Sequence, residues 1–119
     1  NATVLSEKLY SEAITNYRTA IRLDPNNAFA YNNLGAALTD QGNLVEAIIN
    51  HLTSIRLDPN NALAYYDLGN ALYGQGNLAE AITNYRTSIR LDPNYANAYT
   101  SLGAALYNQG NLTESIYSK

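Results

Sequence analysis

The sequence predicts an all-α solenoid built from antiparallel helix pairs. Three observations carry this prediction: a repeat of 34 residues, two helical hydrophobic patterns within each repeat, and turn-forming residues between them. The 119-residue chain accommodates 3.5 such repeats (119/34) without insertions. A single helix pair cannot bury its own apolar stripe, so neighbouring pairs are expected to stack into a continuous core.

The repeat is visible in a conserved string of residues that contains proline. Arg22-Leu-Asp-Pro-Asn-Asn-Ala28 returns from Arg56 unchanged and from Arg90 with one Tyr substitution. Residues 28–61 and 62–95 are identical at 23 of 34 positions. We therefore expect a single domain, residues 1–119, with complete repeats at 28–61 and 62–95 and partial repeats at 1–27 and 96–119.

Each complete repeat contains two stripes of apolar residues at helical spacing. In residues 28–61 the first stripe is Ala30, Tyr31, Leu34, Ala37 and Leu38, and the second is Leu44, Ala47, Ile48, His51 and Ile55. Spacings of three and four place each set on one side of a helix. The chain is expected to begin inside a first helix and to end inside a second helix.

Turn and cap residues separate the helices. Gly42 can adopt the left-handed conformation that ends a helix, and Asn43, three residues before Glu46, is suited to cap the next helix. Pro59 cannot continue a helix interior, so the second helix ends before it, and Asn60 or Asn61 can cap the helix that follows.

Glycines recur inside the first helix of each repeat. Gly35, Gly69 and Gly103 each cost about 1 kcal/mol of helix propensity relative to alanine, so their recurrence predicts close packing between helices. The alanines that recur in the second helix (Ala13, Ala47 and Ala81) are plausible partners for these glycines.

Composition argues against several classes of function. The net charge of −3 and the pI near 4.9 disfavour nucleic-acid binding, which needs clustered Lys and Arg. The absence of Cys and the presence of one His, His51, leave no basis for a thiolate or multi-histidine metal site. No apolar run is long enough to span a membrane, and no catalytic constellation or phosphate-binding loop stands out. We expect no enzyme activity, no cofactor, no nucleic acid and no membrane partner.

The repeat resembles the tetratricopeptide repeat, whose pattern is an aromatic residue, Leu-Gly, a small residue, an aromatic, another small residue and Pro. The corresponding residues in one copy are Tyr31, Leu34-Gly35, Ala47, His51, Ser54 and Pro59, and in the next Tyr65, Leu68-Gly69, Ala81, Tyr85, Ser88 and Pro93. His51 stands where the family pattern has an aromatic residue, and Ser54, Ser88 and Ser115 stand where it has Ala. The resemblance implies a right-handed superhelix whose first helices line a concave groove, and it implies peptide or protein binding without catalysis.

The candidate groove residues are those on the first helices that the packed stripe leaves free. The predicted contacts are Asn33, Tyr66, Asp67, Asn70, Tyr73, Thr100, Ser101 and Tyr107. In residues 28–61 this free face also includes Asn32. The resemblance suggests two ways of holding a peptide, and the residues support neither fully. A carboxylate clamp is disfavoured because the face has no Lys or Arg. An asparagine ladder would be partial, because the position of Asn33 is occupied by Asp67 and Ser101 in the later copies. A neutral or mildly basic extended segment is the expected guest.

Several residues have a structural interpretation instead. Tyr31, Tyr65 and Tyr99 follow the helical period and are expected to pack in the core, and His51 is interpreted as a packing substitution at an aromatic position. The arginines that recur at the end of the second helix (Arg22, Arg56 and Arg90) suit the negative end of the helix dipole.

Other functions remain open at this point. Apolar residues near both ends of the sequence suggest either a piece of a longer array or end-to-end self-association of copies. A self-assembling or designed structural repeat without a natural ligand, and a substrate-recruiting fragment of a larger enzyme such as a glycosyltransferase, are the alternative functions. The sequence does not fix the compartment, and the cytoplasm is favoured.

Overall fold

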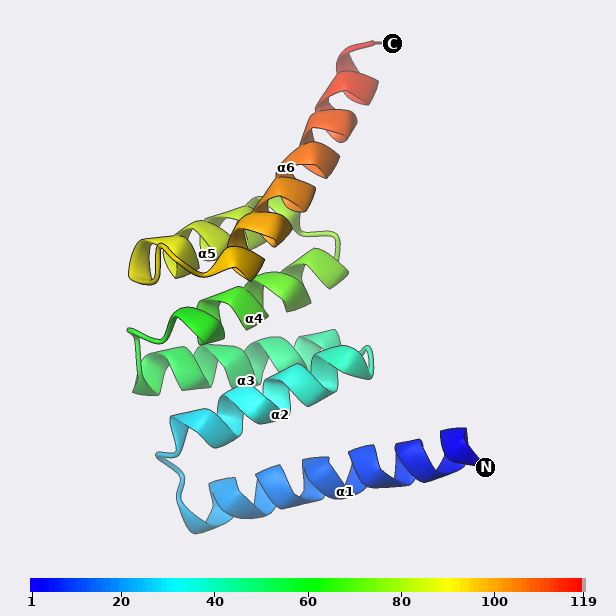
Figure 1. The fold of residues 1–119 in the computed structure, drawn as a ribbon, viewed down its shortest axis with the longest axis vertical. Helices are drawn as coiled ribbons and strands as arrows, with labels where there is room; N and C mark the ends of the chain where they lie inside the picture. Colours follow the sequence, from blue (N-terminus) through cyan, green and yellow to red (C-terminus); the bar gives the residue numbers. More distant parts are fainter. Residues whose placement is uncertain (119) are drawn as a thin grey trace. The chain divides into compact units, whose positions relative to one another are not determined.

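The computed structural model describes residues 1–118, and in this part of the chain the secondary structure consists of α-helices. The helices are α1 (Ala2–Leu23), α2 (Ala28–Asp40), α3 (Leu44–Leu57), α4 (Ala62–Gly74), α5 (Leu78–Leu91) and α6 (Ala96–Tyr117). They form two compact units, the first unit (Asn1–Pro59) with α1–α3 and the second unit (from Asn60) with α4–α6 (Figure 1). The predicted helix pairs are α2 with α3 and α4 with α5.

The turn inside each complete repeat is made by glycine, as predicted. Gly42 and Gly76 have φ angles of 83° and 80°, a region that other residues rarely adopt. After the second helix, α3 and α5 end at Leu57 and Leu91, immediately before an Asp-Pro pair. The Asn61 side chain then accepts a hydrogen bond from the Leu63 amide at 3.1 Å, which confirms it as the cap of α4.

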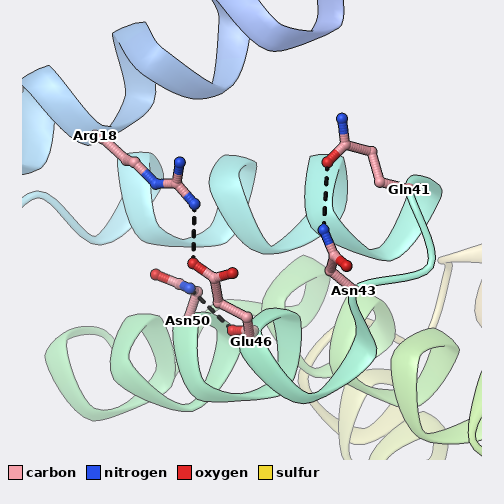
Figure 2. A network of polar contacts seen from close by, with 5 residues as sticks. All are labelled: Arg18, Gln41, Asn43, Glu46 and Asn50. Carbon is pink, nitrogen blue, oxygen red and sulfur yellow. Dashed lines mark hydrogen bonds and ion pairs between the residues drawn. The ribbon is translucent and has the colours of Figure 1, made fainter.

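One predicted cap differs from its counterpart. Asn77 accepts a hydrogen bond from the Glu80 amide at 3.4 Å, whereas Asn43 makes no such side-chain bond to α3. The Asn43 Nδ2 instead donates to Gln41 Oε1 at 3.5 Å, so its side chain is turned toward the preceding helix (Figure 2). Asn43 begins α3 by its position, not by a side-chain cap.

A salt bridge joins the outer two helices of the first unit. Arg18 in α1 donates to Glu46 in α3 at 3.0 Å, while the Glu46 carbonyl accepts from Asn50 at 2.9 Å (Figure 2). Both charged side chains are about half exposed. An ion pair of this kind contributes about 0.2–1 kcal/mol, so apolar packing dominates the stability of the unit.

The glycines inside α2 and α4 receive a ring from the following helix. A Cβ atom on Gly35 would lie 2.6 Å from the His51 ring, and a Cβ atom on Gly69 would lie 2.5 Å from the Tyr85 ring. The prediction of close packing at these two glycines is therefore confirmed. The nearest groups are the rings, however, and not the recurring alanines that we expected.

Two of the three serines that depart from alanine, Ser54 and Ser88, have a structural role. The Ser54 hydroxyl donates to the Ala28 carbonyl at 2.9 Å, and the Ser88 hydroxyl donates to the Ala62 carbonyl at 2.8 Å. Both serines are buried. Each hydroxyl thus links the second helix of a repeat to the start of the first.

The partial repeats at the two ends differ from expectation. We expected the chain to end inside a second helix. Gln109-Gly110-Asn111 repeats the turn sequence of the other copies, but it lies inside α6, which is continuous to Tyr117 (Figure 1). Gly110 lacks the positive φ of Gly42 and Gly76, and residues 110–118 are all exposed. The expected second helix of this repeat is therefore an extension of the first. At the other end, α1 is also one helix of 22 residues.

Within residues 1–118, none of the helices combines the length and the apolar character needed to cross a membrane.

Candidate functional site

Seven of the eight predicted contact residues lie on two helices of the second unit. Tyr66, Asp67, Asn70 and Tyr73 are on α4, and Thr100, Ser101 and Tyr107 are on α6. Helices α4 and α6 contact each other directly, so the structure brings these seven residues into one unit. We call them the polar surface. Asn33 is exposed on α2 in the first unit.

Two side chains of the polar surface are fixed by hydrogen bonds. The Asn70 Oδ1 accepts from the Tyr85 hydroxyl at 2.7 Å, and the Tyr73 hydroxyl accepts from the Asn108 amide. Asn70 and Tyr73 are nevertheless half-buried and keep part of their surface accessible. The bonds therefore hold both side chains in fixed orientations.

Tyr66 has a larger packing role than its sequence position suggested. Its ring centroid lies 5.0 Å from that of Tyr95 and 6.0 Å from that of Tyr85, both in tilted arrangements. Tilted aromatic pairs at these distances are favourable beyond simple burial. Tyr66 therefore supports the start of α6 as well as contributing to the surface.

The two tyrosines that contact the Tyr66 ring, Tyr85 and Tyr95, stay protonated. Burial, together with neighbouring Tyr66, raises the pKa of Tyr85 to about 12, despite an opposing hydrogen bond with Ser101. Burial also raises the pKa of Tyr95, with Tyr66 and the Asp67 carboxylate as further causes. These hydroxyls remain neutral hydrogen-bonding groups and do not supply a general base near neutral pH.

The remaining predicted residues differ in exposure. Tyr107 is 73% exposed, which makes it one of the most accessible aromatic side chains of the second unit. Thr100 is exposed and donates to the Ala96 carbonyl of its own helix at 3.4 Å, while Ser101 is half-buried. The seven residues therefore include one strongly exposed ring, Tyr107, and two side chains that hydrogen bonds orient, Asn70 and Tyr73.

Three residues that contact the polar surface were absent from the predicted contact set. Tyr85 and Asn108 supply the hydrogen bonds that orient Asn70 and Tyr73, and Tyr95 stacks on Tyr66. A signal for Tyr95 was present in the sequence, since it replaces an asparagine that the other copies keep at this position.

Two packing predictions require correction. Asn32, which we placed on the free face, is 2% exposed and its Oδ1 lies 2.7 Å from His51 Nδ1. Tyr99, which we placed in the core, is 49% exposed and donates to the Pro93 carbonyl at 2.9 Å. The interpretation of His51 as a packing residue is consistent with its complete burial.

A metal-binding role has no support in the described residues. Across residues 1–118, no group of three or more His, Cys, Asp or Glu side chains is placed to hold an ion.

The comparisons with solved structures agree on the fold. The first TPR domain of Spaghetti (RPAP3), solved with the HSP90 peptide SRMEEVD, is 23% identical, with a TM-score of 0.84 over 92% of this chain and 86% of that chain. A mutant O-GlcNAc transferase of Thermobaculum terrenum is 29% identical, with a TM-score of 0.77 over 78% of this chain and 18% of that chain. MamA is 30% identical, with a TM-score of 0.81 over 94% of this chain and 66% of that chain.

The sequence comparisons identify the repeat itself. Among the curated proteins, none matches the sequence. The family model described as TPR repeat matches residues 6–42, 35–76 and 69–110. These stretches include both complete repeats and parts of the partial ones, and the helix pairs have the predicted architecture. Repeats of this type support a role as a protein-interaction scaffold, and the chain belongs to the tetratricopeptide repeat (TPR) family.

Proposed function

We propose that this chain is a non-catalytic scaffold that binds an extended peptide segment on the polar surface of α4 and α6. The observation that carries the proposal is the pair of hydrogen bonds that orient Asn70 and Tyr73 while leaving both side chains partly accessible. An oriented amide can bond to a peptide backbone, and the tyrosine rings offer flat contact area with little loss of side-chain entropy.

The charge of the surface favours a neutral or mildly basic guest. Asp67 is the charged residue among the seven, and none of them is Lys or Arg. A carboxylate-rich segment would need charge-assisted donors to offset its desolvation, and the polar surface has none. The neighbour solved with the peptide SRMEEVD binds a segment with three acidic residues. We expect the guest of this chain to differ in charge from that peptide.

Asn33 is proposed as a further contact in the first unit. It is exposed on α2 and carries an amide at the position that Asp67 and Ser101 occupy in the later copies. A recruiting role within a larger enzyme stays an alternative, because one similar structure is a glycosyltransferase of which this chain spans 18%.

Binding can be tested with fluorescent peptides of one length that carry lysine, only neutral residues, or glutamate. We expect the lysine and neutral peptides to bind more tightly than the glutamate peptide, as measured by fluorescence anisotropy. Replacing Tyr73 and Tyr107 together by Ala should abolish binding and leave the helical circular-dichroism signal intact. Equal affinity for all three peptides, or unchanged affinity in the double variant, would contradict the proposal.

Two control variants separate contact from stability. Tyr117→Ala removes an aromatic side chain that is 85% exposed on α6 and lies outside the polar surface, so peptide affinity should be unchanged. Tyr73→Phe removes the hydroxyl that Asn108 bonds but keeps the ring. If orientation by this bond matters, Tyr73→Phe should weaken binding severalfold with little change in unfolding temperature.

A further inference from the structure

One face of α6 lacks the partner that the equivalent faces of α2 and α4 have. Leu38 and Leu72 lie on helices that pack against α3 and α5 and are 1% and 5% exposed, whereas the equivalent Leu106 is 41% exposed. A Cβ atom on Gly103 would meet nothing within 4 Å, although Gly35 and Gly69 each face a ring. The face of α6 around Gly103 and Leu106 therefore has the residues of a first-helix surface, and within residues 1–118 no second helix packs on it.

The first unit has the complementary feature. A cavity of about 410 Å³ lies between α1 and α2, lined by Tyr10, Ala13, Tyr17, Ala37, Asp40 and Gln41. By repeat position, Tyr17 corresponds to Tyr85 and Ala13 to Ala81, so α1 is a second helix. Among the described residues, no first helix pairs with it as α4 pairs with α5. Ala81 and Tyr85 are 0% and 1% exposed, while Ala13 and Tyr17 remain half-buried.

The second unit shows what fills such a cavity. Helices α5 and α6 correspond to α1 and α2 sixty-eight positions earlier, and α4 packs against both α5 and α6. Gly69 of α4 faces the Tyr85 ring there. The cavity between α1 and α2 is thus the equivalent of the site that α4 occupies in the second unit.

We propose that α6 of one copy of this chain occupies the α1–α2 cavity of a second copy, with Gly103 against Tyr17. The two helices then form a composite repeat made from two copies. The occupant is a second copy because α6 carries the Leu-Gly face that this site accepts in the second unit.

The lengths of the two helices fit this arrangement. In the pairs α2–α3 and α4–α5, the facing residues Gly35–His51 and Gly69–Tyr85 set an antiparallel register. The same register, applied to Gly103 and Tyr17, aligns α6 with α1 along almost their whole length, and each helix has 22 residues. The extension of α6 past Gly110 then lies along the first turns of α1.

The extensions carry exposed apolar side chains that this register brings together. On α1, Leu5 and Leu9 continue the stripe of Ala13 and are 57% and 53% exposed. On α6, Tyr117 lies eleven positions after Leu106, about three turns, and is therefore on the same side of the helix. Burial of these residues provides the driving force for association.

One polar contact is specific to the composite repeat. In the second unit, the hydroxyl of Tyr73 pairs with Asn108 across α4 and α6. The residues at the equivalent positions are Tyr107 of one copy and Asp40 of the other. The Tyr107 hydroxyl can donate to the Asp40 carboxylate, which gives a charge-assisted bond in place of the amide bond.

The composite repeat lacks other bonds that the complete repeats have. Ala20 occupies the repeat position at which Ser54 and Ser88 donate to a backbone carbonyl. Ala104 occupies the position at which Asn70 accepts a hydrogen bond from a tyrosine hydroxyl. The association is therefore weaker than the packing inside a chain and reversible. Because the two surfaces differ, it is heterologous and can continue from copy to copy.

The association is tested by sedimentation velocity of the 119-residue chain over a range of concentrations. We expect the average mass to rise with concentration, and we expect Gly103→Ala to weaken association roughly tenfold or more, because the added methyl overlaps the Tyr17 ring of the second copy. The variant should fold, since its Cβ atom meets nothing within 4 Å among the described residues. Ser115→Ala, an exposed change on another side of α6, is the matched control and should associate like the parent.

A mass that does not change with concentration would overturn the proposal, and so would association of Gly103→Ala equal to that of the parent. Tyr107→Phe and Asp40→Asn should each weaken association severalfold. Because the two groups bond to each other, the double variant should lose no more affinity than the single variant with the larger loss. Gly103 lies outside the polar surface, so Gly103→Ala should bind peptides normally. Loss of self-association and loss of peptide binding are thereby distinguishable.

Discussion

His51 and Tyr85 occupy the same repeat position but satisfy their polar atoms differently. The His51 Nδ1 lies 2.7 Å from Asn32 Oδ1, whereas the Tyr85 hydroxyl donates to Asn70 Oδ1 at 2.7 Å. Within the repeat, Asn70 lies four positions, or about one helical turn, after the position of Asn32. The shorter histidine ring and the longer tyrosine side chain therefore pair with asparagines on successive turns. His51 also has a buried Nε2 without a hydrogen-bond partner. Protonation of its ring would therefore add an uncompensated buried charge.

The first unit should lose stability as the pH falls through the titration range of His51. Burial lowers the pKa of His51 from 6.5 to about 4. The neutral ring is favoured in the folded state, so its contribution is complete above pH 6.5, decreases below that value and levels off below pH 4. The total loss is about 3 kcal/mol, at about 1.4 kcal/mol per unit of pKa. Urea unfolding measured between pH 7 and 4 tests this.

A two-residue transplant from the second unit is the matched control for this titration. The variant His51→Tyr with Ala36→Asn copies the Tyr85–Asn70 pair into the equivalent positions of the first unit. The difference in unfolding free energy between variant and parent should grow as the pH falls from 6.5 to 4. A constant difference across this range would show that His51 is not the titrating group.

Two glycines at the same repeat position should respond oppositely to substitution. A Cβ atom on Gly69 would lie 2.5 Å from the buried Tyr85 ring, so Gly69→Ala should destabilise the second unit by about 1–3 kcal/mol. Gly103→Ala meets open space and should stabilise α6 of the dilute monomer by up to about 1 kcal/mol. Thermal unfolding of the two variants would contradict this if their shifts had the same sign.

At the scale of the helices, local sequence predicted most boundaries but not the turn at Gly110. Gln41-Gly42-Asn43 and Gln109-Gly110-Asn111 are identical in sequence, yet the first is a turn and the second is helical. The difference is tertiary. Fourteen residues of α3 follow Gly42 and pack on α2, whereas the residues after Gly110 are exposed along a continuous helix. Turn residues permit a reversal, and packing of the following helix stabilises it.

Alanine should therefore have opposite effects at Gly42 and Gly110. Gly42→Ala places a side chain at φ 83° and should cost about 1–2 kcal/mol of the first unit's stability. Gly110→Ala should strengthen α6 by about 1 kcal/mol and raise the helical signal at 222 nm. A loss of helicity in Gly110→Ala would show that residues 109–111 form a turn in solution.

The polar surface was only partly predictable for a related reason. Helical period places Asp67 and Asn70 on a free face, but it does not show which neighbouring element reaches them. The bond from Asn108 to Tyr73 joins residues 35 positions apart, and the contact of Tyr66 with Tyr95 depends on where α6 begins. The burial of Asn32 was missed because its partner, His51, takes a ring position that is aromatic in other copies. Pairings of this kind need the distance between helices as well as their periodicity.

At the scale of the whole molecule, the described chain has well-packed interiors and two exposed helix extensions. In the second unit, Leu68 and Leu72 are 4% and 5% exposed, whereas Leu112 and Ile116 are 55% and 70% exposed. Local stability follows burial, so the amides of the extensions should exchange quickly while those of the interior are protected.

Hydrogen exchange at two protein concentrations connects this gradient to self-association. In dilute solution we expect little protection for residues 2–9 and 110–117, because few buried contacts hold these turns. At high concentration both segments should gain protection together, since the composite repeat places the extension of one copy along that of another, while α3 should be unchanged. Gly103→Ala should remove the gain in both segments. If only one segment gained protection, or if the variant kept the gain, the copies would be meeting through another surface.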